Sequence, residues 1–335
     1  MKLKNNKTYI IAELGVNHNG KLLLAKKMIR NSKKAGADAI KIQSFISNEM
    51  TSGSALTAEY QSKKKFSQMK LLKKYQFSKT QQILLYKYCK KIKIDFLSSA
   101  FDLKSLKFLK KLHMKYYKIP SGEITNLPLL EEFGRLKKKV LLSTGMSTIK
   151  EIKKAISVMI KNGLNNKDLV IFHCTSSYPT KIDDAHLKVL RKYKKIFKTS
   201  VGYSDHTTEI QTASVAVALG ASFIEKHVTL NKKMSGPDHK SSLNFEELKK
   251  MIHLVRKTER LMGSDNKIVT KSESNNIRYV RKSIVAYKNI KKGSYFTKFN
   301  LTTKRPGHGM NPFYINRLYG KKSKKDFKLD DLISI

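Results

Sequence analysis

Short runs of apolar and β-branched residues alternate along this chain with longer segments in which apolar residues recur at helical spacing. In the segment that holds Ile152, Ala155, Ile156 and Met159, for example, the apolar positions fall on one face of a helix. Alternation of short strands with such helices is typical of βα units and a parallel sheet. Eight strands are expected, at residues 9–13, 39–43, 95–99, 116–121, 140–144, 169–175, 199–204 and 222–227.

The number and spacing of these units predict an α/β fold, a (β/α)8 TIM barrel in residues 1–262. The capping-box spacing of Thr148 with Glu151, and of Asn244 with Glu247, marks the starts of two of its helices. The last amphipathic stripe would be the eighth barrel helix, with a buried face made of Leu248, Met251, Ile252, Val255 and Met262.

The pattern changes after the barrel. Residues 264–276 are polar and show no sustained periodicity, so residues 263–281 are expected to form a linker. Residues 282–335 then show short strand-like runs and turns, beginning with Ser283-Ile284-Val285-Ala286. A β-rich domain of this size is small for independent stability, and we expect it to dock on another surface.

The strongly positive net charge raises an alternative to an enzyme, a nucleic-acid-binding protein. The 335-residue chain has 69 Lys and Arg against 25 Asp and Glu, a net charge of +44. A non-enzymatic nucleic-acid-binding protein would use this charge, and it predicts tight, steeply salt-dependent binding without a divalent metal. The lysines are scattered through nearly every predicted helix, which argues against a specific nucleic-acid partner. A general positive field would still attract an anionic substrate.

Cysteines and hydrophobic stretches exclude other classes. The two cysteines, Cys89 and Cys174, have neither metal-ligand nor redox spacing, and both are expected in the core, Cys174 within a strand. The N-terminal residues contain no apolar signal-peptide segment. No apolar run approaches the roughly 20 residues that span a bilayer. We therefore expect a cytoplasmic protein without a membrane partner.

The carboxyl ends of barrel strands are where TIM barrels carry their active sites. Two lysines with several hydroxyls at one mouth suit a phosphorylated anion, and Glu13 with two histidines offers a corner that could hold a metal. Any one of these residues could instead be structural. The polar strand-end set is Glu13, Lys41, Gln43, Ser98, Ser99, Lys118, Ser121, Glu123, Ser143, Thr144, Thr175, Ser176, Tyr178, Ser204, Asp205, His206, Glu225 and His227.

Two loops near these ends leave alternatives open. Asp238, just after the last strand, could reach the mouth as an acid, a base or a water-mediated metal ligand, or it could be an Asx-type turn residue after Pro237. The segment Asn17-His18-Asn19-Gly20 is either a substrate loop or a turn that leads into a helix.

Several ordered motifs resemble the sialic acid synthase family, in which phosphoenolpyruvate condenses with an N-acetylated mannose-type sugar. The motifs lie at residues 12–20, 118–123, 142–146, 173–175, 178–179, 204–207 and 236–238. The tail, with Ile290-Lys291-Lys292-Gly293, Leu301 and Lys304-Arg305-Pro306-Gly307, resembles the small SAF, or antifreeze-like, domain of these synthases. In the family this domain covers the barrel mouth of the partner subunit in a domain-swapped homodimer.

The resemblance implies roles for individual residues. His206 and His227 would bind a divalent ion, Mn²⁺ or Mg²⁺, and the catalytic cluster would hold Glu13, Glu123 and Asp238. Arg305 would arrive from the partner subunit to hold the N-acyl group of the sugar. The other sugar contacts would be Gln43, Tyr178 and Glu225. Phosphoenolpyruvate would be held by Lys41, Ser99, Lys118, Ser121, Ser143, Ser176 and Ser204.

The identity of the acceptor sugar stays open between several relatives. N-Acetylmannosamine, which gives N-acetylneuraminate, is the first expectation. The segments Ala58–Gln61 and Gly122–Asn126 look more like synthases of N,N'-diacetyllegionaminate, which use 2,4-diacetamido-2,4,6-trideoxymannose, and a pseudaminate synthase is a further alternative. Ala100, Ser176 and His308 depart from residues common in the family, which bears on the acceptor pocket more than on the chemistry.

Overall fold

The computed structural model describes residues 7–57 and 66–335, and these residues divide into two compact units, one ending at Gly263 and one beginning at Ser264. In the first unit, eight parallel strands close into a barrel in sequence order, so the predicted TIM barrel is confirmed. The strands are β1 (Tyr9–Gly15), β2 (Ala39–Ser44), β3 (Asp95–Ala100), β4 (Tyr117–Ile119), β5 (Val140–Ser143), β6 (Leu169–His173), β7 (Ser200–Asp205) and β8 (Phe223–His227).

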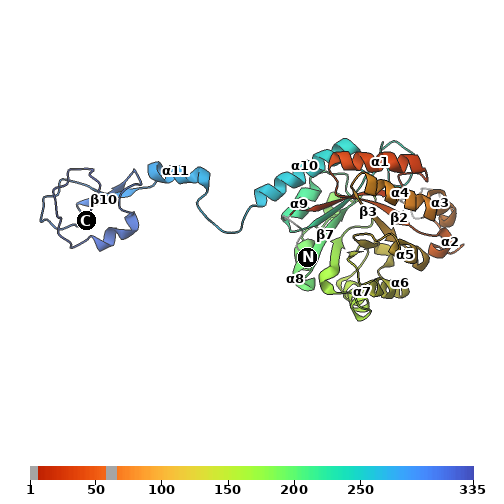
Figure 1. The fold of residues 1–335 in the computed structure, drawn as a ribbon. Coiled ribbons are helices and arrows are strands. Elements are labelled where there is room, and N and C mark those ends of the chain that lie inside the picture. The colour runs from red at the N-terminus through yellow and green to blue at the C-terminus, as the bar shows by residue number, and fades with distance from the viewer. Residues whose placement is uncertain (1–6, 58–65) are drawn as a thin grey trace. The chain divides into compact units, whose positions relative to one another are not determined.

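Helices surround the barrel on its outside (Figure 1). Helix α10 packs against α1 and α9. Among the described residues, the helices of this unit are α1 (Leu22–Ala35), α2 (Ser47–Met50), α3 (Gln68–Tyr75), α4 (Lys79–Lys91), α5 (Leu103–Lys110), α6 (Leu127–Arg135), α7 (Ile149–Lys161), α8 (Val189–Phe197), α9 (Thr212–Ala218) and α10 (Phe245–Met262).

The expected helix starts and buried faces are present, with one error. Thr148 caps α7 and Asn244 caps α10, each through a reciprocal capping box. The stripe of α10 is buried as far as Val255, but Met262 is 54% exposed. The prediction that Met262 belongs to the buried face is therefore wrong. Met262 is the last residue of α10 and lies past Val255, where the buried stripe ends.

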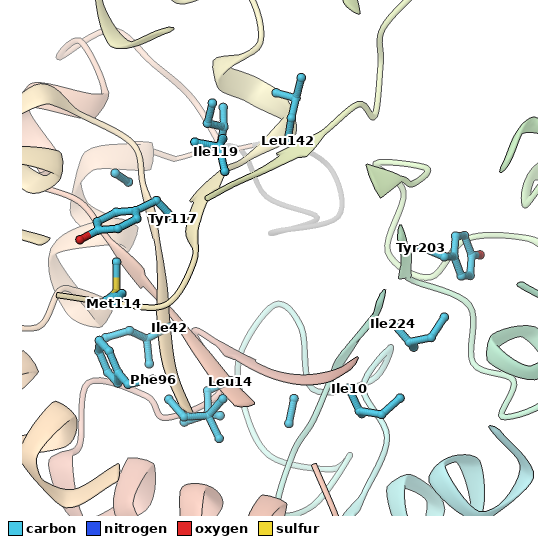
Figure 2. Packing of buried hydrophobic residues seen from close by; sticks show 14 of the residues in the cluster. Ile10, Leu14, Ile42, Phe96, Met114, Tyr117, Ile119, Leu142, Tyr203 and Ile224 are labelled. Atoms are coloured by element: carbon cyan, nitrogen blue, oxygen red, sulfur yellow. The ribbon is translucent and has the colours of Figure 1, made fainter. Parts of the chain in front are cut away.

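Alternating residues of each strand point to opposite sides of the barrel wall, as the period of a strand requires. The outer set packs under the helices in a large hydrophobic cluster, and Figure 2 shows Ile10, Ile42, Leu142, Tyr203 and Ile224 directed away from the barrel centre. The inner set forms a second cluster that fills the lower part of the barrel: Tyr9, Ile11, Ala39, Leu97, Tyr116, Leu141, Val170, Phe172 and Phe223. Above this cluster, at the carboxyl ends of the strands, most inward residues are polar.

The second unit has its own core. Strands β9 (Ser283–Ala286) and β10 (Leu301–Lys304) pair antiparallel, and the buried side chains around them include Ile290, Phe296 and Phe327. Helix α11 (Lys271–Val280) precedes them and belongs to this unit. Gly307 lies against the end of α11, since an added Cβ would come 2.5 Å from the carbonyl oxygen of Ile277.

Helix α11 lies within residues 263–281, which were expected to form a linker and in which no helix was predicted. Its start is a capping box between Thr270 and Glu273, with the carboxylate of Glu273 accepting from the backbone N–H of Thr270 at 3.0 Å. The helix was missed because it has no buried face and therefore shows no apolar stripe. Across residues 7–57 and 66–335, none of the helices combines the length and the apolar character that crossing a bilayer requires.

Candidate active site

A pocket of about 290 Å³ lies at the carboxyl ends of the barrel strands, and every barrel residue for which the family resemblance implied a role lines it, whereas Ser98, Thr144, Thr175 and Asp205 of the polar strand-end set do not. The residues come from all eight strands or from the turns directly after them. The predicted residues on its wall are Glu13, Lys41, Gln43, Ser99, Lys118, Ser121, Glu123, Ser143, Ser176, Tyr178, Ser204, His206, Glu225, His227 and Asp238.

A buried charge network forms the lower part of this pocket. The Glu225 carboxylate lies 3.1 Å from the Nζ atoms of both Lys41 and Lys118, and it accepts a hydrogen bond of 2.9 Å from Ser204 Oγ. Lys41 also lies 3.4 Å from a Glu13 oxygen and donates to Ser99 Oγ at 3.1 Å. Glu225, expected to face the sugar, lines the pocket and pairs with both lysines, and its role toward a sugar stays a prediction.

The two carboxyl groups of the network have pKa values that move in opposite directions. Burial raises the pKa of Glu13 to about 8, and its single close cation, Lys41, does not offset this. Burial also acts to raise the pKa of Glu225, but Lys118 and Lys41 outweigh it and lower that pKa well below its usual range. Near neutral pH, Glu13 therefore carries a proton and Glu225 does not, which is the separation that acid–base chemistry needs.

Aromatic rings form the floor beneath the network. The ammonium group of Lys118 lies 3.7 Å from the ring centroid of Phe172, which is cation–π contact. Phe172 packs against Phe223, and Phe223 meets Tyr9 and Tyr116 with ring centroids 5.4 Å apart in each case. On the neighbouring strand β7, Gly202 lies beside the Phe172 ring. A Cβ at this position would come within 2.8 Å of that ring, so there is no room for a side chain. Burial on this floor lowers the pKa of Lys118.

Hydroxyl groups surround the backbone of Gly145 at one side of the pocket. Its N–H donates to Ser121 Oγ at 3.0 Å, and an added Cβ would lie 2.2 Å from Ser176 Oγ. Ser143 lines the same part of the pocket. Serine hydroxyls that line one pocket together with two lysines are a donor set suited to phosphate oxygens.

His206 and His227 stand side by side at another side of the pocket, with ring centroids 5.5 Å apart. His206 Nδ1 lies 2.7 Å from the carbonyl oxygen of Thr175 in a hydrogen bond. The ring centroids of His206 and Tyr178 are 4.2 Å apart. His227 Nδ1 is buried without a hydrogen-bond partner and lies 3.7 Å from Asp238 Oδ2. Burial lowers the pKa of both histidines, to about 4 for His206, so both rings are neutral near pH 7.

These two histidines fit a divalent ion that keeps open positions for substrate. Neutral imidazole is the form that binds a metal, and the unpartnered Nδ1 of His227 is a free ligand atom. Among the described residues no group of three or more His, Cys, Asp or Glu side chains gathers as a metal site. Asp238, whose pKa burial raises to about 6, lies close enough to act through water.

The sequence left the roles of two loops undecided, the one with Asp238 and the one with Asn17 and His18, and the structure places them differently. Asp238 lines the pocket with its carboxylate 3.7 Å from His227 Nδ1, and its backbone carbonyl oxygen accepts from the hydroxyls of Ser241 and Ser242. Asn17 and His18 are buried away from the pocket. The Asn17 amide donates to the carbonyl oxygen of Val228 at 2.8 Å, so this segment is the turn into α1.

Strand parity corrects part of the polar strand-end set. Ser98, Thr144 and Asp205 were expected at the mouth but lie on the outer side of the barrel wall, since their neighbours Ser99, Ser143 and Ser204 take the inner side. Thr144 contacts Tyr193 of α8, and Asp205 pairs with another outward residue, Lys226, at 2.8 Å.

Sequence reasoning missed several residues of the pocket. Cys174 was expected in a strand and in the core; it is buried as expected, but it follows the end of β6 and also lines the pocket, with Sγ 3.2 Å from Ser121 Oγ. The signal was available, because Cys174 is two residues beyond the inward Phe172. Cys89 is fully buried in the core, as expected. An apolar side of the pocket, contributed by α2, α3 and two turns, was also missed.

Glu123 and Arg305 stand apart from the charge network. Glu123 lines the pocket and accepts a hydrogen bond of 2.7 Å from Asn126, and burial raises its pKa. Arg305 belongs to the second unit, where it is exposed and its Nε donates to the carbonyl oxygen of Val280 at 3.0 Å. Its expected role toward a sugar stays a prediction.

We predict that His18 makes stability fall in acid. Burial lowers the pKa of His18 to about 3 from its usual 6.5, and the ring stacks on Phe77. Because the unfolded chain binds the proton first, the stability from this residue is complete above pH 6.5 and is lost as pH falls toward 3. His18→Asn should flatten the pH dependence of the unfolding free energy between pH 6.5 and about 4. Urea titrations of both proteins measure this, with the exposed His253→Asn as control; equal slopes for wild type and His18→Asn would contradict it.

Comparison with known proteins identifies similar chains. The sequence matches the NeuB family over residues 28–267 and the SAF domain over residues 281–335. It is 47% identical to the N,N'-diacetyllegionaminic acid synthase of Campylobacter jejuni over 330 residues, 98% of this chain and 99% of that protein. It is 36% identical to the pseudaminic acid synthase of the same species over 332 residues, 98% of this chain and 96% of that protein. A crystal structure of the N-acetylneuraminic acid synthetase from Leptospira borgpetersenii matches with a TM-score of 0.74 and 32% identity, covering 83% of this chain and 94% of that one.

Proposed function

Because this chain belongs to the NeuB family, we propose that it condenses phosphoenolpyruvate and water with 2,4-diacetamido-2,4,6-trideoxymannose to give N,N'-diacetyllegionaminic acid and phosphate. The family and the SAF domain expected from the motifs are confirmed. The chain is a phosphoenolpyruvate-using enzyme that forms a carbon–carbon bond.

The choice of acceptor rests on one observation, the 47% identity to a diacetyllegionaminic acid synthase along nearly the whole of both chains. That similarity favours the diacetamido sugar over N-acetylmannosamine, the first expectation. Of the two segments that suggested this alternative, Ala58–Gln61 lies outside the described residues. The other, Gly122–Asn126, begins with two residues that line the pocket.

In the proposed reaction, C3 of phosphoenolpyruvate bonds to the aldehyde carbon of the open-chain sugar. Water adds at C2, and phosphate leaves from that carbon. Lys41 and Lys118 would offset the negative charge of phosphoenolpyruvate, with Glu225 holding both ammonium groups in place. The hydroxyls of Ser99, Ser121, Ser143 and Ser176 would donate to its oxygens, and Ser204, whose hydroxyl donates to Glu225, would help to hold that carboxylate between the lysines.

Proton transfer falls to the carboxyl groups with raised pKa. Glu13, with a pKa of about 8, holds a proton beside Lys41 and can deliver it near neutral pH. Asp238, with a pKa of about 6, is ionised at that pH and can take a proton from the attacking water. His206 and His227 would hold Mn²⁺ or Mg²⁺, and the bound ion supplies Lewis-acid polarisation of the sugar aldehyde.

A homodimer is part of the proposal. The SAF match over residues 281–335 supports a tail that covers the barrel of a partner subunit, with the partner's Arg305 placed at the N-acyl group of the sugar. Arg305 is exposed in its own unit, as such a role requires.

The test is an acceptor comparison. Purified protein with phosphoenolpyruvate and MnCl2 should release phosphate with the diacetamido mannose at a kcat/KM at least about tenfold above that with N-acetylmannosamine, because the acceptor pocket must distinguish acylated from hydroxylated positions. The 6-deoxy altrose acceptor of pseudaminate synthases is the third arm. A preference for N-acetylmannosamine or for the altrose sugar would refute the proposed acceptor, and the absence of phosphate release with all three would refute the proposed reaction.

A further inference from the structure

One side of the pocket is largely apolar, although Gln68 of α3 also lines the pocket, and none of the roles proposed above uses this side. Its side chains come from the turn after β1, from α2 and α3, and from the residue after β3. We call this surface the apolar wall; it consists of Val16, Met50, Leu71, Leu72, Tyr75 and Phe101.

The wall has a buried base and a partly exposed edge. Val16, Leu72 and Tyr75 are buried in one hydrophobic cluster with Phe45, and the wall's other three side chains pack against that cluster while remaining partly exposed. Concave apolar surface that the described residues leave partly exposed beside a few directed polar groups is typical of a subsite for an apolar part of a ligand. The cluster beneath holds the edge in place, so the surface is formed before a ligand binds.

The wall begins next to the histidine corner. Val16 follows Gly15, where an added Cβ would lie 2.9 Å from His227 Cε1 and 3.2 Å from Asp238 Oδ2. An acceptor whose reacting carbon sits at that corner therefore has the wall beside it. Phosphoenolpyruvate, with its carboxylate and phosphate, matches the lysines of the charge network and gains nothing from carbon surface.

We infer that the apolar wall receives the C6 methyl group of the acceptor and thereby selects 6-deoxy sugars over 6-hydroxylated ones, an inference that rests on the proposed function. The reacting aldehyde carbon is C1, so C6 is the opposite end of the open chain. A hydroxyl pressed against aliphatic and aromatic carbon loses hydrogen bonds to water, whereas a methyl group gains from the same contact.

The experiment compares two acceptors that differ at one atom. They are 2,4-diacetamido-2,4,6-trideoxymannose and its 6-hydroxylated counterpart, 2,4-diacetamido-2,4-dideoxymannose, each assayed by phosphate release at saturating phosphoenolpyruvate. The wild type should prefer the 6-deoxy sugar about 10- to 100-fold in kcat/KM, the discrimination that an apolar pocket gives for a small group. Leu71→Gln and Met50→Gln should each reduce this ratio severalfold by offering the hydroxyl a partner.

Leu84→Gln is the matched control, since Leu84 is a partly exposed leucine of α4 outside the pocket, and it should leave the ratio unchanged. Two wall positions are used so that a folding defect in one variant, seen in its melting curve, does not decide the result. A wild-type ratio near 1, or a ratio within twofold of wild type in both wall variants, overturns the inference while leaving the proposed reaction intact. Failure of the wild type to use either diacetamido sugar overturns the proposed function as well, so the two failures are distinguishable.

Discussion

Replacing His227 with alanine is expected to abolish phosphate release from phosphoenolpyruvate, with a loss on the order of 10³-fold or more, while the barrel remains folded. A bound metal that polarises a carbonyl supplies several kcal/mol to a reaction barrier, and each 1.4 kcal/mol is about tenfold in rate. His227 lies in the pocket with Nδ1 unpartnered, so its removal takes a ligand atom and leaves the outward packing of β8 unchanged. His206→Ala should have the same effect.

The measurement has two readouts. Phosphate release reports activity, and titration of Mn²⁺ followed by electron paramagnetic resonance reports binding of the ion directly. His253→Ala is the control, because His253 is exposed on α10 and should change neither. Full activity in either His206→Ala or His227→Ala would show that the metal assignment is wrong, and normal Mn²⁺ affinity in an inactive variant would assign that histidine to the chemistry instead.

Breaking the ion pair between Lys226 and Asp205 is expected to be the most destabilising charge substitution in the barrel. Both side chains are 0% exposed, and Lys226 also donates to the carbonyl oxygens of Thr207 and Glu209. Lys226→Met leaves the Asp205 carboxylate buried without its cation, which costs about 3–5 kcal/mol of unfolding free energy. Urea titration followed by circular dichroism measures the loss.

An exposed ion pair provides the comparison. Lys104 and Glu49 lie 2.6 Å apart, but the Lys104 side chain is 63% exposed, so Lys104→Met should cost less than about 1 kcal/mol. The double variant Lys226→Met with Asp205→Asn should lose less than the sum of the two single variants, since it removes both charges together. Equal losses for Lys226→Met and Lys104→Met would contradict the stabilising role of the buried pair.

Strand positions and pocket residues could be predicted from the sequence for a shared reason. A barrel strand buries both of its faces, so each run is continuous and apolar until its carboxyl end, where polar inward residues begin. Glu13, Lys41 and Glu225 break their apolar runs in this way, and the structure places all three in one network.

The side of the barrel wall on which a polar residue lies was not predicted, although the period of two along each strand carries this information. Lys226 lies between the inward residues Glu225 and His227 in the sequence. The period of two therefore places its side chain outside the barrel, where it pairs with Asp205. The apolar wall was not predicted. Its helix α3 lies in the segment between β2 and β3, and the apolar stripe of α3 looks like that of any amphipathic helix, so the sequence does not show that this stripe faces a pocket. Helix α11, with its polar faces, gave no periodic signal.

The aromatic floor has a consequence for the order of events in the proposed reaction. Tyr9, Tyr116, Phe172 and Phe223 fill the barrel below Lys118, so a molecule that rests on the lysines is the deepest occupant. A sugar bound along the apolar wall then covers it from above. Because the pocket is closed at its lower end, phosphoenolpyruvate would have to bind before the sugar. Sugar in excess would bind first, prevent phosphoenolpyruvate from entering and inhibit turnover.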